Sequence, residues 1–284
     1  MRIVCVLAVA VVLAFPRMAA AQPGQPDIQG FWRPVVDGAS HSVEEGPEPA
    51  NANITGQRDR KRQTIMVGGG RDPQLPYQPW AAAKRLDHLA NFHTPTKWAH
   101  LDPEDRCLLN GVPRSNYRGT MQILQSPGYV TILYEWNHAY RVIPLDGRPH
   151  APAAVKQWNG DSRGRWEGNT LVVDVTNFLV DDAEHNVQPW FDSHGSFYSD
   201  ALHVVERYTV VNADTIRYEA TVEDPKVFTR PWQVGFTVSR NKQPGYELLE
   251  EACVEGERNT PGMIAAGRIA KAAGQTGIHT HGEK

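Results

Sequence analysis

The sequence predicts a mainly β protein, folded as an antiparallel up-and-down β-barrel with one or two short flanking helices. The first observation is residues 166–178, WEGNTLVVDVTNF, where a Gly168-Asn169 turn precedes a run of alternating apolar residues. Gly-Asn between extended runs indicates a hairpin, because a tight primed turn needs positive φ, which these residues tolerate. The second observation is that short turns and alternating runs recur between residues 121 and 254 without an intervening long helix.

The strands are expected in series along the chain. Short turns such as Ser126-Pro127-Gly128 and Asn212-Ala213-Asp214 separate them, so neighbours in sequence should be neighbours in space. About nine strands with few helices favour a closed or nearly closed barrel, and a two-sheet sandwich is the competing architecture. The expected strands are residues 28–33, 121–125, 129–136, 140–144, 155–158, a hairpin from 165 to 178 after a loop at 160–164, 201–211, 215–223, 232–240 and 246–254.

The rest of the chain is expected to flank this barrel core of residues 119–256. Residues 22–118 should supply an N-terminal strand, a long surface excursion at 37–79, a short helix packed on the barrel, and a loop at 93–118. Pro79 suits the first turn of that helix, whose apolar face would carry Ala82, Leu86 and Leu89. Residues 257–284 should form a short helix and a polar tail.

The N-terminus is interpreted as a signal peptide covering residues 1–21. Arg2 precedes an apolar run at 3–15, and small residues lead to a cleavage site near Ala21-Gln22. The apolar run is too short to span a bilayer comfortably. We therefore expect a periplasmic or secreted protein with no stable membrane anchor, and an uncleaved anchor is the alternative.

Two cysteines remain once Cys5 leaves with the signal peptide. In an oxidising compartment, Cys107 and Cys253 are expected to form one disulfide. The alternative is two separate buried thiols, since the sequence alone does not show that they are close.

The charge balance and the motifs exclude several classes of partner. The chain carries a formal charge of −3, and removing Arg2 and Arg17 brings the mature chain to −5, which argues against nucleic acid. There is no nucleotide-binding glycine motif and no haem-attachment motif, so no cofactor is expected. No metal site is expected either, because the three histidines of the downstream region lack compact ligand spacing: His185, His194 and His203. Eight Trp and nine Tyr can supply flat walls for a small-molecule ligand.

The strongest candidate for chemistry is a carboxylate on the apolar face of a strand. Residues two apart share a face, so Glu206 points inward with Val204 and Tyr208, and the partner strand ends with Asp224 on the same side. Burying a lone carboxylate is costly unless it is paired or protonated, and a raised pKa suits a general acid or base. The alternative is a structural ion pair with one of three arginines: Arg207, Arg141 or Arg165.

Two further groups are candidates. Glu135, His138 and Arg141 surround a predicted hairpin turn at one end of the barrel, where histidine could exchange protons and arginine could hold an anion. An exposed turn with satisfied polar residues is the alternative. In residues 161–167, Arg165 and Trp166 could line a cavity wall, whereas a plain Asx-turn is the simpler interpretation.

Several motifs resemble an uncharacterised family of secreted bacterial proteins. They are DGRPH at 146–150, GDSRGRWEG followed by TLVVDVTNF at 160–178, LHVVERYT at 202–209 and VEDPKVFTRPW at 222–232. The resemblance covers most of the mature chain and implies secretion, but it implies no established activity and carries over no catalytic residue. Separately, Gly30-Phe31-Trp32 is similar to the G-x-W of lipocalins, a match of only three residues that agrees with a calycin-like barrel.

Three classes of function remain open. The leading hypothesis is a small-molecule-binding barrel with cofactor-free acid–base chemistry on a partly apolar substrate, as in a lyase, hydratase, isomerase or hydrolase. In it Glu206 acts as acid or base and His138, beside Glu135, as its proton partner. The substrate would be bound by Arg141, Arg165, Trp166, Asp224 and Tyr208. The alternatives are a non-catalytic ligand carrier or sensor, and an envelope scaffold with a filled interior.

Overall fold

The computed structural model describes residues 24–35, 75–180, 188–193, 195–253 and 260–275. The predicted signal peptide, most of the predicted excursion at 37–79 and the end of the polar tail lie outside these ranges. The same holds for His185 and His194.

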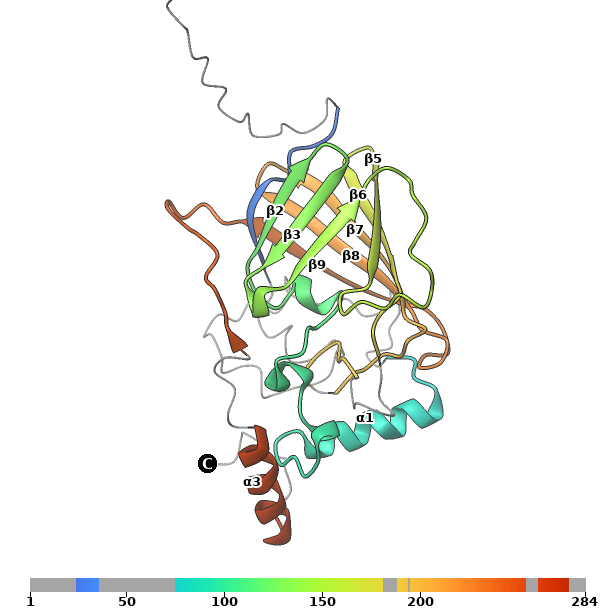
Figure 1. Cartoon of the computed structure of the whole chain (residues 1–284), viewed down its shortest axis with the longest axis vertical. Helices are drawn as coiled ribbons and strands as arrows, with labels where there is room; N and C mark the ends of the chain where they lie inside the picture. Colours follow the sequence, from blue (N-terminus) through green and yellow to red (C-terminus); the bar gives the residue numbers. More distant parts are fainter. Residues whose placement is uncertain (1–23, 36–74, 181–187, 194, 254–259, 276–284) are drawn as a thin grey trace, which may run out of the picture.

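Nine antiparallel strands form one sheet that curls into a nearly closed barrel (Figure 1). The sheet order is β4-β3-β2-β1-β9-β8-β7-β6-β5, so consecutive strands are neighbours and β1 pairs with β9. The predicted up-and-down barrel is therefore confirmed. The strands are β1 (Gly30–Pro34), β2 (Met121–Ser126), β3 (Tyr129–Tyr134), β4 (Tyr140–Pro144), β5 (Asp161–Glu167), β6 (Thr170–Thr176), β7 (His203–Asn212), β8 (Thr215–Glu223) and β9 (Trp232–Arg240).

The barrel wall is interrupted where its two edge strands, β4 and β5, meet; we call this junction the seam. In the described part of the chain, β4 pairs only with β3 and β5 only with β6. The two edges are nevertheless packed together. A Cβ added at Gly164 of β5 would lie 2.6 Å from Ile143 Cγ2 and 2.7 Å from Leu145 Cδ2. Side chains, rather than a ladder of main-chain hydrogen bonds, hold the seam.

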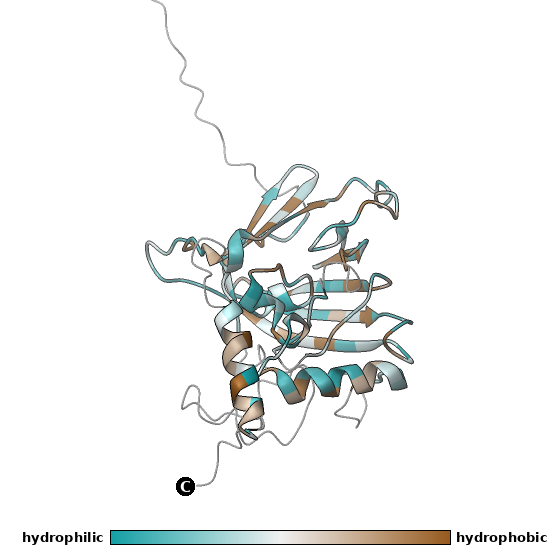
Figure 2. Ribbon diagram, turned by 60° about the horizontal axis from the view of Figure 1, so that its bottom comes forward, coloured by the Kyte–Doolittle hydropathy of each residue, from teal (hydrophilic) through white to brown (hydrophobic). Residues whose placement is uncertain are grey.

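The interior is built by the alternation that the sequence predicts. Along β7, Val204, Glu206 and Tyr208 are fully buried, while the residues between them are only partly buried. Figure 2 shows hydrophobic and hydrophilic positions alternating along the strands.

The β5–β6 turn also follows the prediction in part. Gly168 has φ +60°, whereas Asn169 does not have a positive φ, which is typical of a type II′ turn.

Three predicted boundaries are wrong. Residues 155–158 form no strand and contribute one isolated bridge, Gln157 to Phe178. The loop expected at 160–164 belongs to β5, whose pairing with β6 begins at Asp161. Residues 246–253 are not a strand either, because the second edge of β9 is occupied by β1, with Trp32 opposite Arg240. That pairing joins segments that are far apart in the sequence, so the local sequence pattern does not predict it.

Two helices lie beneath the barrel in Figure 1: α1 (Pro79–Asn91) and α3 (Thr260–Ala272). Neither of these described helices is long and apolar enough to cross a membrane. The predicted face of α1 is wrong, since Leu86 is 60% exposed. The buried positions are instead Ala81, Arg85, His88 and Asn91.

The helix turns this polar face inward because its partners are aromatic rings and main-chain carbonyls. His88 stacks on Trp190 at 4.9 Å between ring centroids, and its Nδ1 lies 3.1 Å from the Gly195 carbonyl oxygen.

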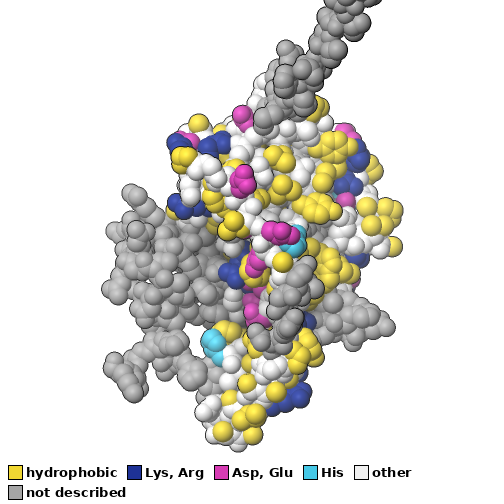
Figure 3. Space-filling model, turned by 60° about the vertical axis from the view of Figure 1, so that its left-hand side comes forward, with side chains coloured by type: hydrophobic (Ala, Val, Ile, Leu, Met, Phe, Trp, Pro, Cys, Tyr) yellow, Lys and Arg dark blue, Asp and Glu magenta, His cyan; other side chains and the backbone are white. Residues whose placement is uncertain are grey.

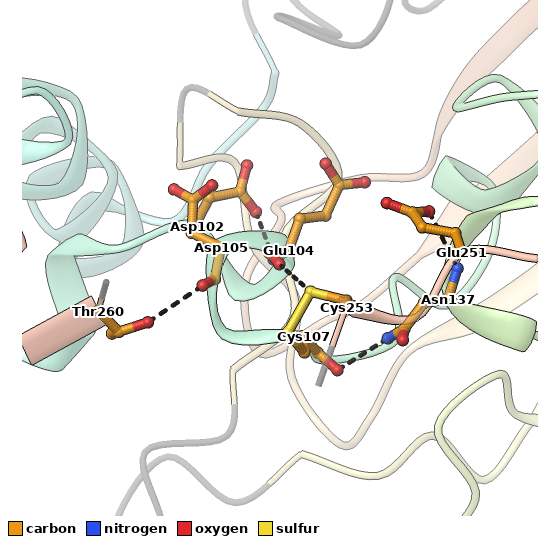
Figure 4. The surroundings of a disulfide bond; sticks show 8 residues. All are labelled: Asp102, Glu104, Asp105, Cys107, Asn137, Glu251, Cys253 and Thr260. Atoms are coloured by element: carbon orange, nitrogen blue, oxygen red, sulfur yellow. Dashed lines mark hydrogen bonds between the residues drawn. A yellow bond between two sulfur atoms is a disulfide. The ribbon is translucent and has the colours of Figure 1, made fainter. Parts of the chain in front are cut away.

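The predicted disulfide between Cys107 and Cys253 is confirmed (Figure 4). It links the segment after β9 to the region between α1 and β2. Hydrogen bonds surround it: Asn137 Nδ2 donates to the Cys107 carbonyl at 2.8 Å, and Thr260 Oγ1 donates to the Asp105 carbonyl at 3.3 Å. The disulfide therefore sits where the C-terminal segment attaches to the base of the barrel.

We expect Cys107→Ala/Cys253→Ala to lower the free energy of unfolding by about 4–5 kcal/mol, because the bond closes a loop with a sequence separation of 146. Urea denaturation followed by tryptophan fluorescence checks this. Wild type unfolded in the presence of dithiothreitol should match the double variant. A loss below about 1 kcal/mol would contradict the expectation.

His88 should make the fold sensitive to acid. Burial lowers its pKa from 6.5 to about 4, against the opposing effect of the Gly195 carbonyl. The unfolded chain therefore binds a proton near pH 6.5 that the folded chain resists, so stability present above pH 6.5 is lost as the pH falls toward 4. We expect His88→Gln to remove up to about 3 kcal/mol of this pH dependence. Urea midpoints at pH 7 and pH 4.5 measure it. His138→Gln, in an exposed turn, is the control and should keep the wild-type slope.

Candidate functional site

A buried polar cluster surrounds Glu206 inside the barrel. Its carboxylate has no exposed surface and is contacted by five donor atoms. Arg141 of β4 donates through Nη2 to Oε2 at 2.5 Å and through Nη1 to Oε1 at 3.2 Å. Oε1 also accepts from Asn116 Nδ2 at 2.7 Å, Tyr208 OH at 3.1 Å and Tyr218 OH at 3.0 Å. The alternative of a structural ion pair with Arg141 is thus the arrangement that the structure contains.

The Arg141 guanidinium also reaches across the seam. Its Nη2 donates to Ser162 Oγ of β5 at 2.9 Å, and its Nη1 lies 3.4 Å from Tyr134 OH. Its Nε is buried and has no hydrogen-bond partner among the described residues. One side chain therefore connects β4, β5 and β7 while keeping one unsatisfied donor in the interior.

Asn116 enters the interior from the segment that was predicted to be a loop. It belongs to a 3-10 helix, η4 (Arg114–Asn116), and its side chain is fully buried. Its Oδ1 accepts from Tyr134 OH at 2.9 Å and lies 3.1 Å from Tyr208 OH. The Asn116 side chain thus links the Glu206 carboxylate to the hydroxyls of Tyr134 and Tyr208.

A second buried ion pair fixes η4 in place. Arg114 has no exposed surface, and its two terminal nitrogens donate to Asp102 at 2.9 and 2.7 Å. Its Nη2 also lies 3.0 Å from Glu104 Oε2. Asp102 directly precedes η3 (Pro103–Arg106) and Glu104 lies in its first turn, which Asp102 caps by accepting from the Glu104 amide. The position of Asn116 therefore depends on charges two to fourteen residues upstream rather than on its own strand pairing.

The electrostatics keep the tyrosines of the cluster protonated and its arginine charged. Burial raises the pKa of Tyr134 to about 12, and burial reinforced by the Glu206 charge raises the pKa of Tyr208 and Tyr218 well above the usual value. Burial by itself disfavours the charged Arg141, but the adjacent carboxylate outweighs it and raises the pKa of the guanidinium. The phenols therefore remain hydrogen-bond donors. Four of the five donors converge on Oε1, and among the described residues Oε2 accepts only from Arg141.

The other predicted catalytic residues lie away from this cluster. His138 is in a turn outside the barrel, with its side chain 44% exposed and Nε2 3.5 Å from Glu250 Oε1. Glu135, just before that turn, accepts from Tyr246 OH at 3.2 Å. The turn carries positive φ at Asn137 and His138. The hydrogen bonds to Glu206 in the described structure come from other residues.

The predicted binding residues are divided between the two faces of the barrel. Trp166 points inward and packs against the core, whereas its neighbour Arg165 points outward and pairs with Glu167 at 2.6 Å. Adjacent residues of a strand face opposite sides, so these two cannot share one wall. Asp224 is buried just after β8, where it accepts from the amide and hydroxyl of Ser199 at 2.6 and 2.8 Å. It shapes a loop, and burial raises its pKa.

Sequence reasoning brought together Glu206, Arg141 and Tyr208, and it missed the rest of the cluster. The sequence does predict an inward position for Tyr218, because side chains alternate between the two faces along β8. Ser162 was hidden by the error at the start of β5. Asn116 carries no signal at all, since it reaches the interior by the folding of an irregular segment.

The described residues contain no group of three or more histidine, cysteine, aspartate or glutamate side chains suited to a metal ion. The face shown in Figure 3 mixes hydrophobic, acidic and basic side chains, and its described part carries no continuous basic surface.

Comparisons with known proteins leave the family open. No protein-family model matches the chain, and no curated protein shows significant similarity to it. Among solved structures, the chain is similar to a crystal structure of a secretary abundant heat soluble (SAHS) protein from Ramazzottius varieornatus. The match has 12% sequence identity, covers 54% of this chain and 87% of that one, and has a TM-score of 0.28, which is too low to carry an argument.

We expect Arg141→Met to lower the free energy of unfolding by about 3–5 kcal/mol, because it leaves the Glu206 charge buried without its partner. The double variant Arg141→Met/Glu206→Leu should recover most of that loss, since neither charge then remains inside. Urea denaturation of the two single variants and the double variant measures the coupling. Arg165→Met, which removes an exposed pair, should change stability by less than about 1 kcal/mol. Additive losses in the double variant would contradict the interpretation.

Proposed function

We propose that this protein is a secreted or periplasmic β-barrel that binds a small, partly apolar molecule carrying a hydrogen-bond acceptor, and that it acts as a carrier or sensor. The observation that supports this most directly is the unpartnered Nε of Arg141, buried in the interior. A buried donor without a partner costs about 1–3 kcal/mol, so a bound acceptor atom at this position would be stabilised.

The surroundings suit the rest of such a ligand. Aromatic rings lie next to the polar cluster: Tyr208 and Tyr218 are 5.0 Å apart, and Tyr218 and Phe236 are 4.7 Å apart, between ring centroids. Rings of this kind offer apolar surface while their hydroxyls serve the carboxylate. A carboxylate or carbonyl on an aromatic or aliphatic body matches both features.

The seam supplies the route inward. The cluster residues have no exposed surface, so a ligand reaches them only if the wall opens. Every other junction of the barrel is a main-chain ladder, whereas β4 and β5 have none in the described structure. The internal bond across the seam, Arg141 to Ser162, involves the same guanidinium that would receive the ligand.

Binding fits the geometry better than catalysis does. Acid–base chemistry by Glu206 would need a proton partner and release of the carboxylate from its ion pair, but Arg141 bonds both carboxylate oxygens and His138 lies at an exposed turn. The proposed compartment is supported by the disulfide between Cys107 and Cys253, because such bonds persist in oxidising surroundings.

We expect 2-naphthoate to bind and to change the tryptophan fluorescence, and 2-methylnaphthalene, which lacks an acceptor, to bind at least about tenfold more weakly. Mass spectrometry of the recovered 2-naphthoate should show no conversion. Ser162→Ala, which removes the bond across the seam but no charge, should speed association of 2-naphthoate. Conversion of the probe would favour an enzyme, and failure of both probes to bind would favour a scaffold; either outcome overturns the proposal.

A further inference from the structure

We propose that His150 is a pH-dependent clasp that holds the seam closed from outside, so that the interior becomes more accessible as the pH rises. His150 lies in the connection at residues 145–160, which leads from β4 to β5 across the seam. The clasp would regulate access to the interior that the proposed function assigns to the ligand, so its biological purpose rests on that function.

The geometry around the imidazole ring demands two N–H donors. His150 Nδ1 lies 2.8 Å from Asp161 Oδ2, and Nε2 lies 2.9 Å from Asp174 Oδ1. A neutral imidazole has one N–H, so in that state one ring nitrogen would direct its lone pair at a carboxylate oxygen. Only the imidazolium form satisfies both contacts, and the ring is 27% exposed, so protons can reach it from solvent.

Further charged groups lie around the clasp. On β5, Arg163 Nη1 lies 2.7 Å from Asp161 Oδ1. On β7, His203 Nε2 lies 3.1 Å from Asp174 Oδ2, and its Nδ1 lies 3.9 Å from Glu223 Oε2 of β8. Three carboxylates therefore face one guanidinium and two imidazoles, and a positive charge on His150 reduces the excess of negative charge.

The clasp acts on the strand end that closes the seam. The Ala151 amide donates to Asp161 Oδ2 at 2.9 Å, and Arg163 Nε donates to the Pro149 carbonyl at 2.8 Å, so the connection is bound to the start of β5 on both sides of His150. Asp161 directly precedes Ser162, which accepts the bond from Arg141 inside the barrel. The outer clasp and the inner bond thus hold neighbouring residues of one strand.

The direction of the response follows from the proton count. At low pH both ring nitrogens donate and the connection is held. When the pH rises and the ring loses a proton, one contact becomes repulsive and the connection is released. The seam should therefore loosen as the pH rises.

Hydrogen exchange of the ligand-free protein, followed by mass spectrometry, tests the clasp. Peptides covering residues 140–162 are compared at pH 5.5 and pH 8 after correction for the intrinsic exchange rate. We expect opening to increase about tenfold in wild type, which corresponds to one charge-assisted hydrogen bond. His150→Arg, which keeps two N–H donors at both pH values, should stay closed, and His150→Gln should be open at both. The matched control is His203→Gln. His203 contacts the same Asp174 from β7, and the variant should retain the wild-type pH response.

The result separates this inference from the proposed function. Absence of a pH response in wild type, or a wild-type response in His150→Arg, overturns the clasp even if 2-naphthoate binds. Exchange that follows the expected pattern supports the clasp even if no probe binds, in which case only the ligand proposal fails. Where both hold, stopped-flow association of 2-naphthoate should be faster at pH 8 than at pH 5.5 in wild type and equal at the two pH values in His150→Arg.

Discussion

The pairing of Glu206 with Arg141 is the constraint on which the rest of the interior depends. Two charges without solvent are tolerated only when they are paired and their remaining hydrogen-bonding capacity is used. The carboxylate recruits the hydroxyls of Tyr208 and Tyr218 and the amide of Asn116. That requirement explains why the irregular segment that carries Asn116 enters the barrel. A further buried ion pair, at Arg114, holds this segment in place. One carboxylate thus organises strands and loops from across the chain.

The barrel closes by one distant pairing and leaves one junction unpaired. β1 and β9 join the two ends of the strand series through hydrogen bonds, while β4 and β5 meet through side chains alone in the described structure. The connection between these two strands lies outside the seam and carries His150, and the guanidinium of Arg141 lies inside it. Both act on the first two residues of β5. The junction without a main-chain ladder therefore has charged contacts on both its inner and its outer side.

The ion pair of the central carboxylate bears on the choice between binding and catalysis. A catalytic acid or base needs a vacant position from which it can exchange a proton with a substrate. Both oxygens of Glu206 are bonded to Arg141, whereas the guanidinium retains one N–H that has no partner among the described residues. A ligand's acceptor atom could bind the unpaired Nε–H of Arg141 without breaking any bond of the cluster. Proton transfer by Glu206 would require breaking its ion pair with Arg141.

The sequence by itself determined the features that arise between near neighbours. Alternation placed Glu206 and Tyr208 inside, short turns set the strand order, and the cysteine count predicted the disulfide, because each depends on local geometry or on composition. The tertiary structure alone decided which arginine meets Glu206, that β1 rather than residues 246–253 covers β9, and that Asn116 and the polar face of α1 turn inward. These outcomes depend on which groups can satisfy a buried charge or an open strand edge, and the partners are brought together only when the chain has closed on itself.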